Sequence, residues 1–417
     1  MSIAGLLRLP DYRRVWLLGG IANAMRWLEI LAGTLWVFEQ TGSALAVSIV
    51  VMMRAFPMLL FGAVAGALAE RFDRRYVLAV LQATSALSAG LVVALAVSGL
   101  LQPWHLMAQG LVAGLSWSGE MATRRRMVAD LAPPGEAVRA IAFDTLTGSM
   151  TRALGPLLGG VLFQFTGLAV AVAIACLFHL VALWLVLRIT PPPRPSGPPM
   201  PASFAGIVVA ARFARRDARL RLVLAMTLVM NVFGFAYAAT LPAFGAEAFG
   251  VSGAAVGLLA AAEPFGALLG GLWLTLRPGR APGAASFIAG STGFLLVVVA
   301  VAYVPFYGLA LALLVLGGLG TARFAALQTS MVMVAAPVEM RSRVLGLVTT
   351  CIGCSPFGVL AMGVLADGVG VRVGMVVMAG VGLLVLWGFL GWERLRPPAS
   401  HAAQQGRGEG GTKRDIG

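Results

Sequence analysis

Lysine is almost absent from this sequence. Of the 31 basic residues only one, Lys413, is a lysine, and it lies in the polar C-terminal segment. A P-loop ATPase needs a lysine directly after a glycine-rich loop inside a folded domain, because that side chain binds the nucleotide phosphates. The chain therefore carries no such ATPase, and a function that needs energy must draw on a gradient or on a separate subunit.

Charged residues of both signs are scarce as well. They make up 12% of the 417 residues, whereas hydrophobic residues make up 59%. About a quarter of a soluble domain is charged, so we expect this chain to fold in a lipid bilayer. The net charge of +14 does not indicate nucleic-acid binding, because the arginines occupy short segments between apolar runs.

Cysteine is rare too. Cys176, Cys351 and Cys354 all lie in apolar segments, which excludes the disulfide framework of a secreted protein. The pattern Cys351-x-x-Cys354 has a redox or metal-binding alternative, but we interpret it as two small residues one turn apart on a packed helix. No cluster of metal ligands or of catalytic His, Asp and Ser residues is evident. The sequence therefore predicts no enzyme, no metal site and no cofactor.

Twelve apolar runs are long enough to cross about 30 Å of hydrocarbon. They do not alternate with a period of two and are about twice as long as the strands of a membrane β-barrel, so we expect helices. The runs fall near residues 15–38, 44–69, 76–98, 104–123, 140–165, 167–188, 221–244, 252–276, 283–304, 306–327, 344–366 and 371–392. The sequence thus predicts an all-α membrane protein with twelve transmembrane helices.

The basic residues predict the orientation in the membrane. If the N-terminus is cytoplasmic, 26 of the 31 basic residues lie in cytoplasmic segments, Arg372 lies in an outer segment, and four lie within spans. Cytoplasmic loops carry the excess of positive charge in such proteins. We therefore predict a multi-pass protein of the bacterial inner membrane with both termini in the cytoplasm.

A proline-rich stretch separates the first six runs from the last six. Residues 190–201 contain seven prolines and cannot be helical. Residues 203–221 form a basic amphipathic segment suited to the anionic inner leaflet. We predict an N-terminal half (1–189), a cytoplasmic linker (190–220), a C-terminal half (221–395) and a disordered cytoplasmic tail (396–417).

The two halves share an internal spacing. Ser43 precedes Arg54 by eleven residues, and Ser252 precedes Glu263 by eleven. The fifth and eleventh runs each contain a mid-helix proline. We therefore predict two pseudo-symmetric six-helix halves, the arrangement with which secondary transporters open to alternate sides of a site near the midplane.

The loop between the second and third runs resembles the signature loop of the major facilitator superfamily. It reads Gly-Ala-Leu-Ala-Glu-Arg-Phe-Asp-Arg-Arg from Gly66 to Arg75, with Glu70 where the family usually has aspartate. The resemblance implies the major facilitator fold and a latch of acidic and basic groups on the cytoplasmic side. The residues of this loop are Gly66, Glu70, Arg71, Asp73, Arg74 and Arg75.

The fifth run resembles the glycine–proline motif of the fifth helix in drug/proton antiporters. Small residues allow close helix packing there, and proline bends the helix. Residues 41–44, with the Arg-Ala-Phe-Pro that begins at Arg54, are most similar to the branch that holds enterobactin-type siderophore exporters and macrolide efflux proteins. That branch often has an acid early in the first span, where this chain has Arg26. The motif residues are Gly148, Gly155, Pro156, Gly159 and Gly160.

Ionisable side chains within the spans are costly and are candidates for function. Glu29 lies twelve residues before Thr41 and Arg54 thirteen after it, so we expect both at the same depth on a helical hairpin. We predict a Glu29–Arg54 pair that Arg26, one turn away, is able to share. The alternative is that these charges only fix helix packing.

A second pair is expected across the halves. The resemblance implies that the fifth and eighth spans meet, so Arg152 should lie near Glu263. Trp27 lies beside the charges in the first span and is a candidate to face the substrate. The candidates for substrate binding and proton coupling are therefore Arg26, Trp27, Glu29, Arg54, Arg152 and Glu263.

Glu120 and Arg323 occupy matching places in the fourth and tenth spans. The resemblance implies that these spans flank the cavity, so we consider Glu120, Arg323 and Asp144 as candidates for a cytoplasmic gate, with packing as the alternative. His179 is alone in the sixth span. We interpret it as a packed histidine rather than a proton relay.

The leading hypothesis is a secondary active transporter that exports a small organic molecule, drug- or siderophore-like, in exchange for protons by alternating access. The excess of buried arginine favours an anionic or oxygen-rich substrate. An importer or uniporter of an anionic metabolite on the same fold is the main alternative, and a non-transporting membrane receptor is the third. The expected partners are the small-molecule substrate, protons and the lipid bilayer, with no nucleic acid, and we expect a monomer.

Overall fold

A computed structural model describes residues 3–190, 204–276 and 283–395, without the side chains of residues 61–71, 122, 204–207 and 338. Within these residues the regular elements are helices. The elements before residue 190 are α1 (Ile3–Leu7), α2 (Pro10–Thr41), α3 (Ala44–Arg71), α4 (Arg74–Val97), α5 (Pro103–Asp130) and α6 (Ala137–Leu187). The later elements are α7 (Phe204–Ala214), α8 (Ala218–Val229), η1 (Met230–Gly234), η2 (Phe235–Thr240), α9 (Leu241–Phe249), α10 (Gly253–Leu276), α11 (Ala284–Tyr303), α12 (Tyr307–Ala335), α13 (Val338–Ile352), α14 (Ser355–Val369) and α15 (Val371–Leu395).

Nine helical segments of the described chain are long and apolar enough to cross a membrane. One of them, α6, contains two of the predicted spans. Two further spans are α3, which is apolar from Ala44 to Leu60, and α5, which is 28 residues long. The described chain therefore contains the twelve predicted helices, and the all-α membrane fold is confirmed.

The 51-residue α6 is two helices joined at Gly167, where φ is 76° and ψ is 176°. Glycine adopts a positive φ without strain, unlike residues with a Cβ. The chain turns back at this point, because Gly159 on one side and His179 on the other both approach α2 around Leu28 and Glu29. Thus α6 supplies the fifth and sixth spans.

The seventh and eleventh spans are interrupted. Between α8 and α9 the backbone passes through the π-helical η1 and the 3-10 helical η2. In the eleventh span, α13 and α14 meet at Gly353, and Pro356 lies in the first turn of α14, where proline needs no hydrogen-bond donor. Cys351 and Cys354 therefore flank a helix junction instead of sharing one helix as we expected, and both are free thiols.

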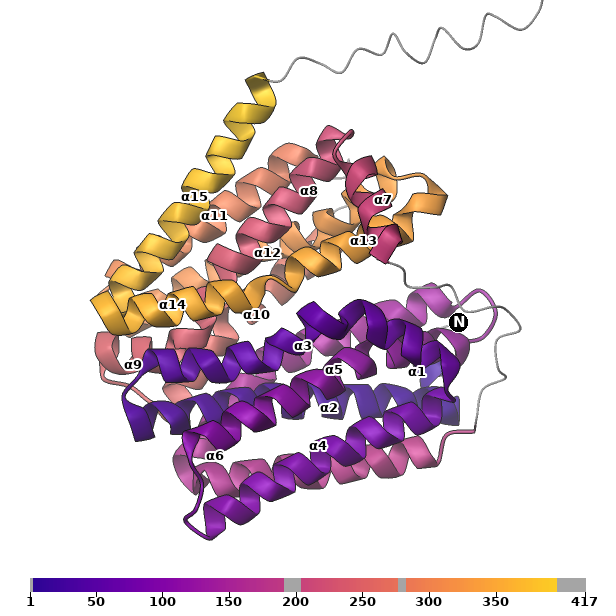
Figure 1. Ribbon diagram of the computed structural model, residues 1–417. Coiled ribbons are helices and arrows are strands. Elements are labelled where there is room, and N and C mark those ends of the chain that lie inside the picture. The colour runs from indigo at the N-terminus through magenta and orange to yellow at the C-terminus, as the bar shows by residue number, and fades with distance from the viewer. Residues whose placement is uncertain (1–2, 191–203, 277–282, 396–417) are drawn as a thin grey trace, which may run out of the picture.

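The helices form two bundles (Figure 1). We term α1–α6 the N-half and α7–α15 the C-half. The end at which α2 and α8 begin is the terminal end, and the end at which α2 meets α3 is the distal end. In Figure 1 the halves lie against each other at the distal end, on the left, and spread apart toward the terminal end, on the right.

The predicted linker overlaps the bundle that we term the C-half. Helix α7 and the start of α8 lie within the predicted linker of residues 190–220. Residues 191–203 and the predicted tail from residue 396 lie outside the described residues. The boundaries stay a prediction.

At the distal end, Asp367 of α14 caps the start of α3 in the other half. Its carboxylate accepts hydrogen bonds from the backbone N–H groups of Ala44 at 2.7 Å and Leu45 at 3.2 Å. The Ser43 hydroxyl donates to it at 2.5 Å. The first N–H groups of a helix have no partner within the helix, so the C-half satisfies donors of the N-half here.

A second cap runs in the opposite direction. Gln164 of α6 accepts a hydrogen bond through Oε1 from the backbone N–H of Ala254, at 2.9 Å, in the first turn of α10. Each half therefore caps a helix of the other half at the distal end.

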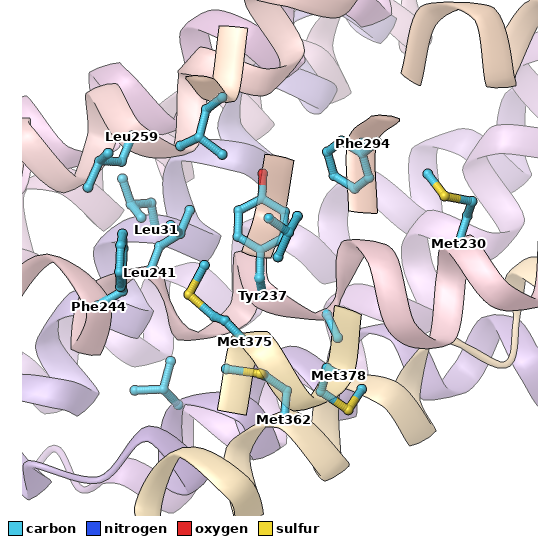
Figure 2. Close-up of a cluster of buried hydrophobic side chains, with 14 of the residues drawn as sticks. Leu31, Met230, Tyr237, Leu241, Phe244, Leu259, Phe294, Met362, Met375 and Met378 are labelled. Atoms are coloured by element: carbon cyan, nitrogen blue, oxygen red, sulfur yellow. The ribbon is translucent and has the colours of Figure 1, made fainter. Parts of the chain in front are cut away.

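Apolar packing continues the distal contact. Figure 2 shows part of a buried cluster in which methionine and aromatic side chains of the C-half surround Tyr237. Leu31 of α2 belongs to the same cluster, beside Leu241 and Leu259. Lipid tails are as apolar as leucine, so close packing rather than the hydrophobic effect stabilises such contacts inside a bilayer.

Candidate functional site

Glu29 of α2 and Arg54 of α3 form the expected ion pair. Arg54 Nη2 donates to Glu29 Oε2 at 3.0 Å, and the two side chains are 10% and 4% exposed, respectively. Helix α2 ends at Gly42 in the left-handed conformation, and Ser43 caps the start of α3. This short hairpin sets both residues at one depth. The contact is confirmed, and its role in transport stays a prediction.

A histidine and two glutamines extend this pair through the N-half. Glu29 Oε1 faces His179 Nε2 at 3.4 Å, and Glu29 Oε2 accepts a long hydrogen bond from Gln109 Nε2 at 3.4 Å. His179 Nδ1 lies 3.0 Å from Gln82 Oε1. Gln82 Nε2 in turn donates to Glu120 Oε2 at 3.2 Å. A continuous polar path therefore links α2, α6, α4 and α5.

The sequence alone suggests a packed side chain for His179 and does not single out Gln82. A signal for His179 was present in the sequence. His179 lies twelve residues after Gly167, and Glu29 lies twelve before Thr41. Both glycine-containing turns are at the distal end, so the depth argument that predicted Arg54 also predicts His179.

Arg26 does not share Glu29, contrary to our expectation. Its guanidinium lies over the ring of Trp117 at 4.2 Å and near that of Trp27 at 4.8 Å. Its Nε is buried without a hydrogen-bond partner, and within the described residues Arg26 forms no ion pair. Cation–π contacts stabilise the charge but leave its N–H donors without acceptors. Trp117 was missed because nothing in its spacing distinguishes it.

Arg26 and the polar side chains around Glu29 surround a small cavity. Its volume of about 30 Å³ has room for one or two water molecules. The polar or charged residues around it include Asn23, Arg26, Glu29, Arg54, Ser85, Ser88, Trp117, Glu120, Arg124 and His179. A larger cavity of about 680 Å³ lies at the distal end, beside Trp36 and the turn at Gly167, and its described lining contains none of the charged residues of the small cavity.

Arg152 and Glu263 form the expected pair across the halves. Arg152 Nη2 donates to Glu263 Oε2 at 2.8 Å, with side chains 41% and 4% exposed. Thr321 of α12 donates to Glu263 Oε1 at 2.5 Å. The Arg152 guanidinium also lies 6.0 Å from the ring centre of Trp27. Trp27 therefore lies near both Arg26 and the cross-half pair.

The gate candidates lie in separate halves in this arrangement. Arg124 pairs with Glu120 at 3.6 Å and with Asp144, so Asp144 belongs to the N-half cluster. Arg323 lies over Trp273 in the C-half, 5.7 Å from the ring centre. A Glu120–Arg323 bond that forms only when the terminal ends meet is not tested by an arrangement with these ends apart. The gate stays a prediction.

The described part of the signature loop forms polar contacts with three helices of the N-half, α4, α5 and α6. Asp73 caps α4 by accepting from the Arg75 N–H at 2.9 Å. Arg74 forms an ion pair with Asp130 of α5, and the Arg75 side chain donates to the backbone carbonyl of Leu187 in α6. Gly66, Glu70 and Arg71 lie where side chains are not described. The cross-half latch stays a prediction.

Three glycines of the helix-five motif lie at close helix contacts. A Cβ on Gly155 or Gly159 would meet atoms of α2 at 2.5 and 2.6 Å, and a Cβ on Gly160 would overlap the backbone of α10. Gly148 has more space, and Pro156 lies inside α6. Small residues at these places allow α6 to pack against both halves.

Comparison with known proteins decides the family. A family model described as transmembrane secretion effector matches residues 2–407. The chain belongs to this family. It is 30% identical over 143 residues to YfiS, an uncharacterized MFS-type transporter of Bacillus subtilis (strain 168), and the match spans 34% of the chain and 33% of that protein. The match thus covers about a third of the relative's length. Membership of the major facilitator superfamily is confirmed.

Solved transporter structures share the fold. A bacterial homologue of the human lysosomal transporter Spinster, in an inward-facing and unoccupied conformation, superposes with a TM-score of 0.70 at 15% identity, over 90% of this chain and 96% of that one. The nucleoside transporter NupG gives 0.70 at 12% identity, over 92% and 99%. The human organic anion transporter MFSD10 gives 0.63 at 17% identity, over 91% and 99%. At these identities the likeness shows the fold alone. The chain is a membrane transporter of the major facilitator type.

Proposed function

We propose that this transporter exports a small, oxygen-rich organic molecule, drug- or siderophore-like, in exchange for protons by alternating access. The buried polar cluster around Glu29, Arg54 and Arg26 carries the proposal. Charged groups within a membrane are costly and mark substrate and ion pathways. In this cluster the Glu29 carboxylate, which is able to take up a proton, lies one helical turn from the Arg26 guanidinium. Arg26 has no ion-pair partner within the described part of the chain.

The surroundings of Arg26 support an oxygen-rich substrate. A guanidinium offers its N–H donors in a planar fork that suits carboxylate and other oxygen acceptors. The two indole rings beside Arg26 supply no such acceptor, and a polar group buried without one is destabilising. A carboxylate, phenolate or carbonyl oxygen of a ligand would complete its hydrogen bonds, which are stronger when one partner is charged.

The arrangement of the halves supports a state open to the cytoplasm. The arginine distribution favours a cytoplasmic location for the terminal end. The polar contacts described between the halves lie from the middle to the distal end. The Spinster homologue with the same fold is described as inward-facing. Rocking of the halves would close the terminal end and open the distal end.

Inside-out membrane vesicles with an acidified lumen test the proposal, because in them an exporter carries substrate into the lumen as protons leave. We expect a membrane-impermeant, oxygen-rich member of a compound panel, such as carboxyfluorescein, to accumulate, and a proton uncoupler to stop it. Arg26→Ala should weaken binding about ten- to a hundredfold, the value of one hydrogen bond to a charged group. Exposed Arg13 provides the control, and Arg13→Ala should leave accumulation unchanged.

Two outcomes would overturn export. Uptake of the panel compounds by intact cells that persists with the uncoupler would indicate an importer or uniporter of an anionic metabolite. Purified protein that moves none of the panel in liposomes, yet binds one of its members, would indicate a receptor.

A further inference from the structure

The contact between His179 and Glu29 is incomplete without an added proton. Gln82 donates its amide N–H to Glu120 at 3.2 Å, which turns its amide oxygen toward His179 Nδ1 at 3.0 Å. An amide oxygen only accepts hydrogen bonds, so Nδ1 carries a proton. The tautomer follows from this network. In a neutral imidazole the other nitrogen, Nε2, is then an acceptor.

This acceptor faces a second one. His179 Nε2 lies 3.4 Å from Glu29 Oε1, and the two side chains are 6% and 4% exposed. Oε1 is buried and has no hydrogen-bond partner among the described residues. Two acceptors that face each other away from water are both unsatisfied. One added proton on either atom converts the contact into a hydrogen bond, which is charge-assisted when the proton is on Nε2 and Glu29 is ionised.

We propose that His179 and Glu29 hold one proton between them, and that hydroxyl groups of the substrate compete with this proton for the same two acceptors. The inference rests on the proposed function, because it makes this proton the one exchanged for substrate. Loading adds one proton from solvent to Nε2 or Oε1, and unloading returns it to solvent. No other bond forms or breaks.

The neighbouring cavity defines the substrate class. Its volume of about 30 Å³ has room for one or two hydroxyl-sized groups. In the unloaded state Glu29 Oε1 and His179 Nε2 accept from O–H donors, and Arg26 donates to a nearby oxygen. A matching ligand carries hydroxyl groups together with a carbonyl or anionic oxygen, as hydroxy acids and catechol carboxylates do. The loaded state loses the acceptors, so proton and ligand exclude each other.

Charged or titratable groups on the same two helices and on neighbouring helices lie near this proton. They are Arg26 on α2, Arg54 on α3, Glu120 and Arg124 on α5, and Cys176 on α6. Arg54 is paired with Glu29, and Glu120 is linked to His179 through the neutral Gln82 of α4. The shared proton therefore lies among charges of both signs.

Nitrogen NMR of labelled histidine in lipid nanodiscs tests the shared proton. The chain has three histidines, so His105→Gln with His401→Gln leaves His179 alone. Glutamine suits position 105, since His105 accepts from the Gln102 N–H at the start of α5 at 2.9 Å and glutamine does the same in capping boxes.

We expect Nδ1 of His179 to stay protonated while Nε2 gains its proton in one step. Glu29→Gln, which supplies a donor to Nε2, should remove that step. An Nε2–H tautomer, or a titration that Glu29→Gln leaves unchanged, would refute the shared proton.

A matched pair of probes tests the competition. 3,4-Dihydroxybenzoate and 3,4-dimethoxybenzoate share a carboxylate and differ in their hydroxyl donors. By calorimetry we expect the dihydroxy compound to bind about tenfold more tightly, the value of roughly one hydrogen bond. Its affinity should fall by about tenfold per pH unit below the titration midpoint, as for one excluded proton. His179→Gln keeps a donor for Gln82 and should abolish this pH dependence, whereas His105→Gln should not. Equal, pH-independent binding of both probes would refute the competition.

The outcomes separate this inference from the proposed function. If the proton site and the competition are found but vesicles show no proton-driven accumulation, the dyad stands and export fails. If proton-driven accumulation is found and His179→Gln leaves its pH profile unchanged, export stands and the dyad is not its proton carrier.

Discussion

The two halves of this transporter share a fold but differ in their interiors. The N-half buries a connected set of charged and polar groups around Glu29. In the C-half, aromatic rings fill the interior: Phe287 stacks on Phe324 with centroids 5.5 Å apart, and Phe235 packs against Phe294 at 5.4 Å. The same helix arrangement therefore tolerates either interior. We interpret the N-half as the bearer of the site and the C-half as the body that moves against it.

The equivalent positions of Arg54 and Glu263 in the two halves show how the halves differ. Arg54 on α3 and Glu263 on α10 each lie eleven residues after a serine at the distal end. Arg54 finds its partner, Glu29, within its own half. Glu263 takes Arg152 from the other half. The repeat thus preserves a buried charge at each position, but one charge organises the site and the other joins the halves.

Removing Arg54 should have the largest effect, because it disrupts the N-half interior. Arg54→Ala leaves Glu29 buried and uncompensated, which costs about 3–5 kcal/mol. We expect transport in vesicles to be abolished while the protein still inserts, as measured by membrane yield and size-exclusion profile. Phe324→Leu in the C-half is the contrasting control, which should lower thermal stability and leave transport measurable. A normal rate in Arg54→Ala would remove this residue from the mechanism.

The cross-half pair should matter next. Glu263→Gln keeps an acceptor for Thr321 but removes the ion pair with Arg152, at about 1.5–3 kcal/mol for a hydrogen bond between charged groups. We expect slower transport and a lower melting temperature. Exchange of the two charges, Arg152→Glu with Glu263→Arg, should restore part of both. If the exchange is no better than the single variants, the pair does not join the halves energetically.

The depth of a charged side chain along its helix was predictable from the sequence. The direction in which that side chain points around the helix was not. Counting from the distal turns set Glu29 level with Arg54, and the same count applies to His179. Arg26 is one turn from Glu29, yet its long side chain reaches Trp117 on another helix. That choice depends on the rotation of α2 against α5, which single-sequence spacing does not fix. The tautomer of His179 depends on Gln82 and Glu120 together, so it required the packed structure.

The gate prediction addresses a state in which the terminal ends have closed. A Glu120–Arg323 bond in that state would be worth about 1–3 kcal/mol, a shift of about five- to a hundredfold. Arg323→Ala is the cleaner variant, since Glu120 also binds Gln82 in the N-half cluster. We expect it to raise alkylation of Met121→Cys, which lines the small cavity, in a background without the native cysteines. Unchanged labelling, or a charge exchange Glu120→Arg with Arg323→Glu that gives no recovery, would leave these residues a packing role.

The distal end is where the halves are most alike, and its variants should have the smallest effects. Leu45 and Ala254 occupy the same repeat position two residues after a serine, and each donates its N–H to a side chain of the other half. The two acceptors, Asp367 and Gln164, each stand three residues before a glycine with positive φ, Gly370 and Gly167. The caps are therefore equivalent in position and differ in charge.

If both caps hold the distal end closed, loss of either should favour its opening. An N-cap acceptor is worth about 0.5–2 kcal/mol, and the carboxylate adds about 0.3–1 kcal/mol through the α3 dipole, so Asp367→Ala should exceed Gln164→Ala slightly. Ser48→Cys reports opening, because Ser48 is fully buried against Gly363 of α14. Thr166→Ala, beside Gln164 but bonded within its own helix, is the control. Asp367→Asn should keep most of the closure, since it retains an acceptor.

Additive increases in alkylation for the double variant Asp367→Ala with Gln164→Ala would mean that two independent caps close this end. If Asp367→Asn instead raises alkylation as much as Asp367→Ala does, the charge of Asp367 alone closes this end. The two halves would then resemble each other only in backbone geometry.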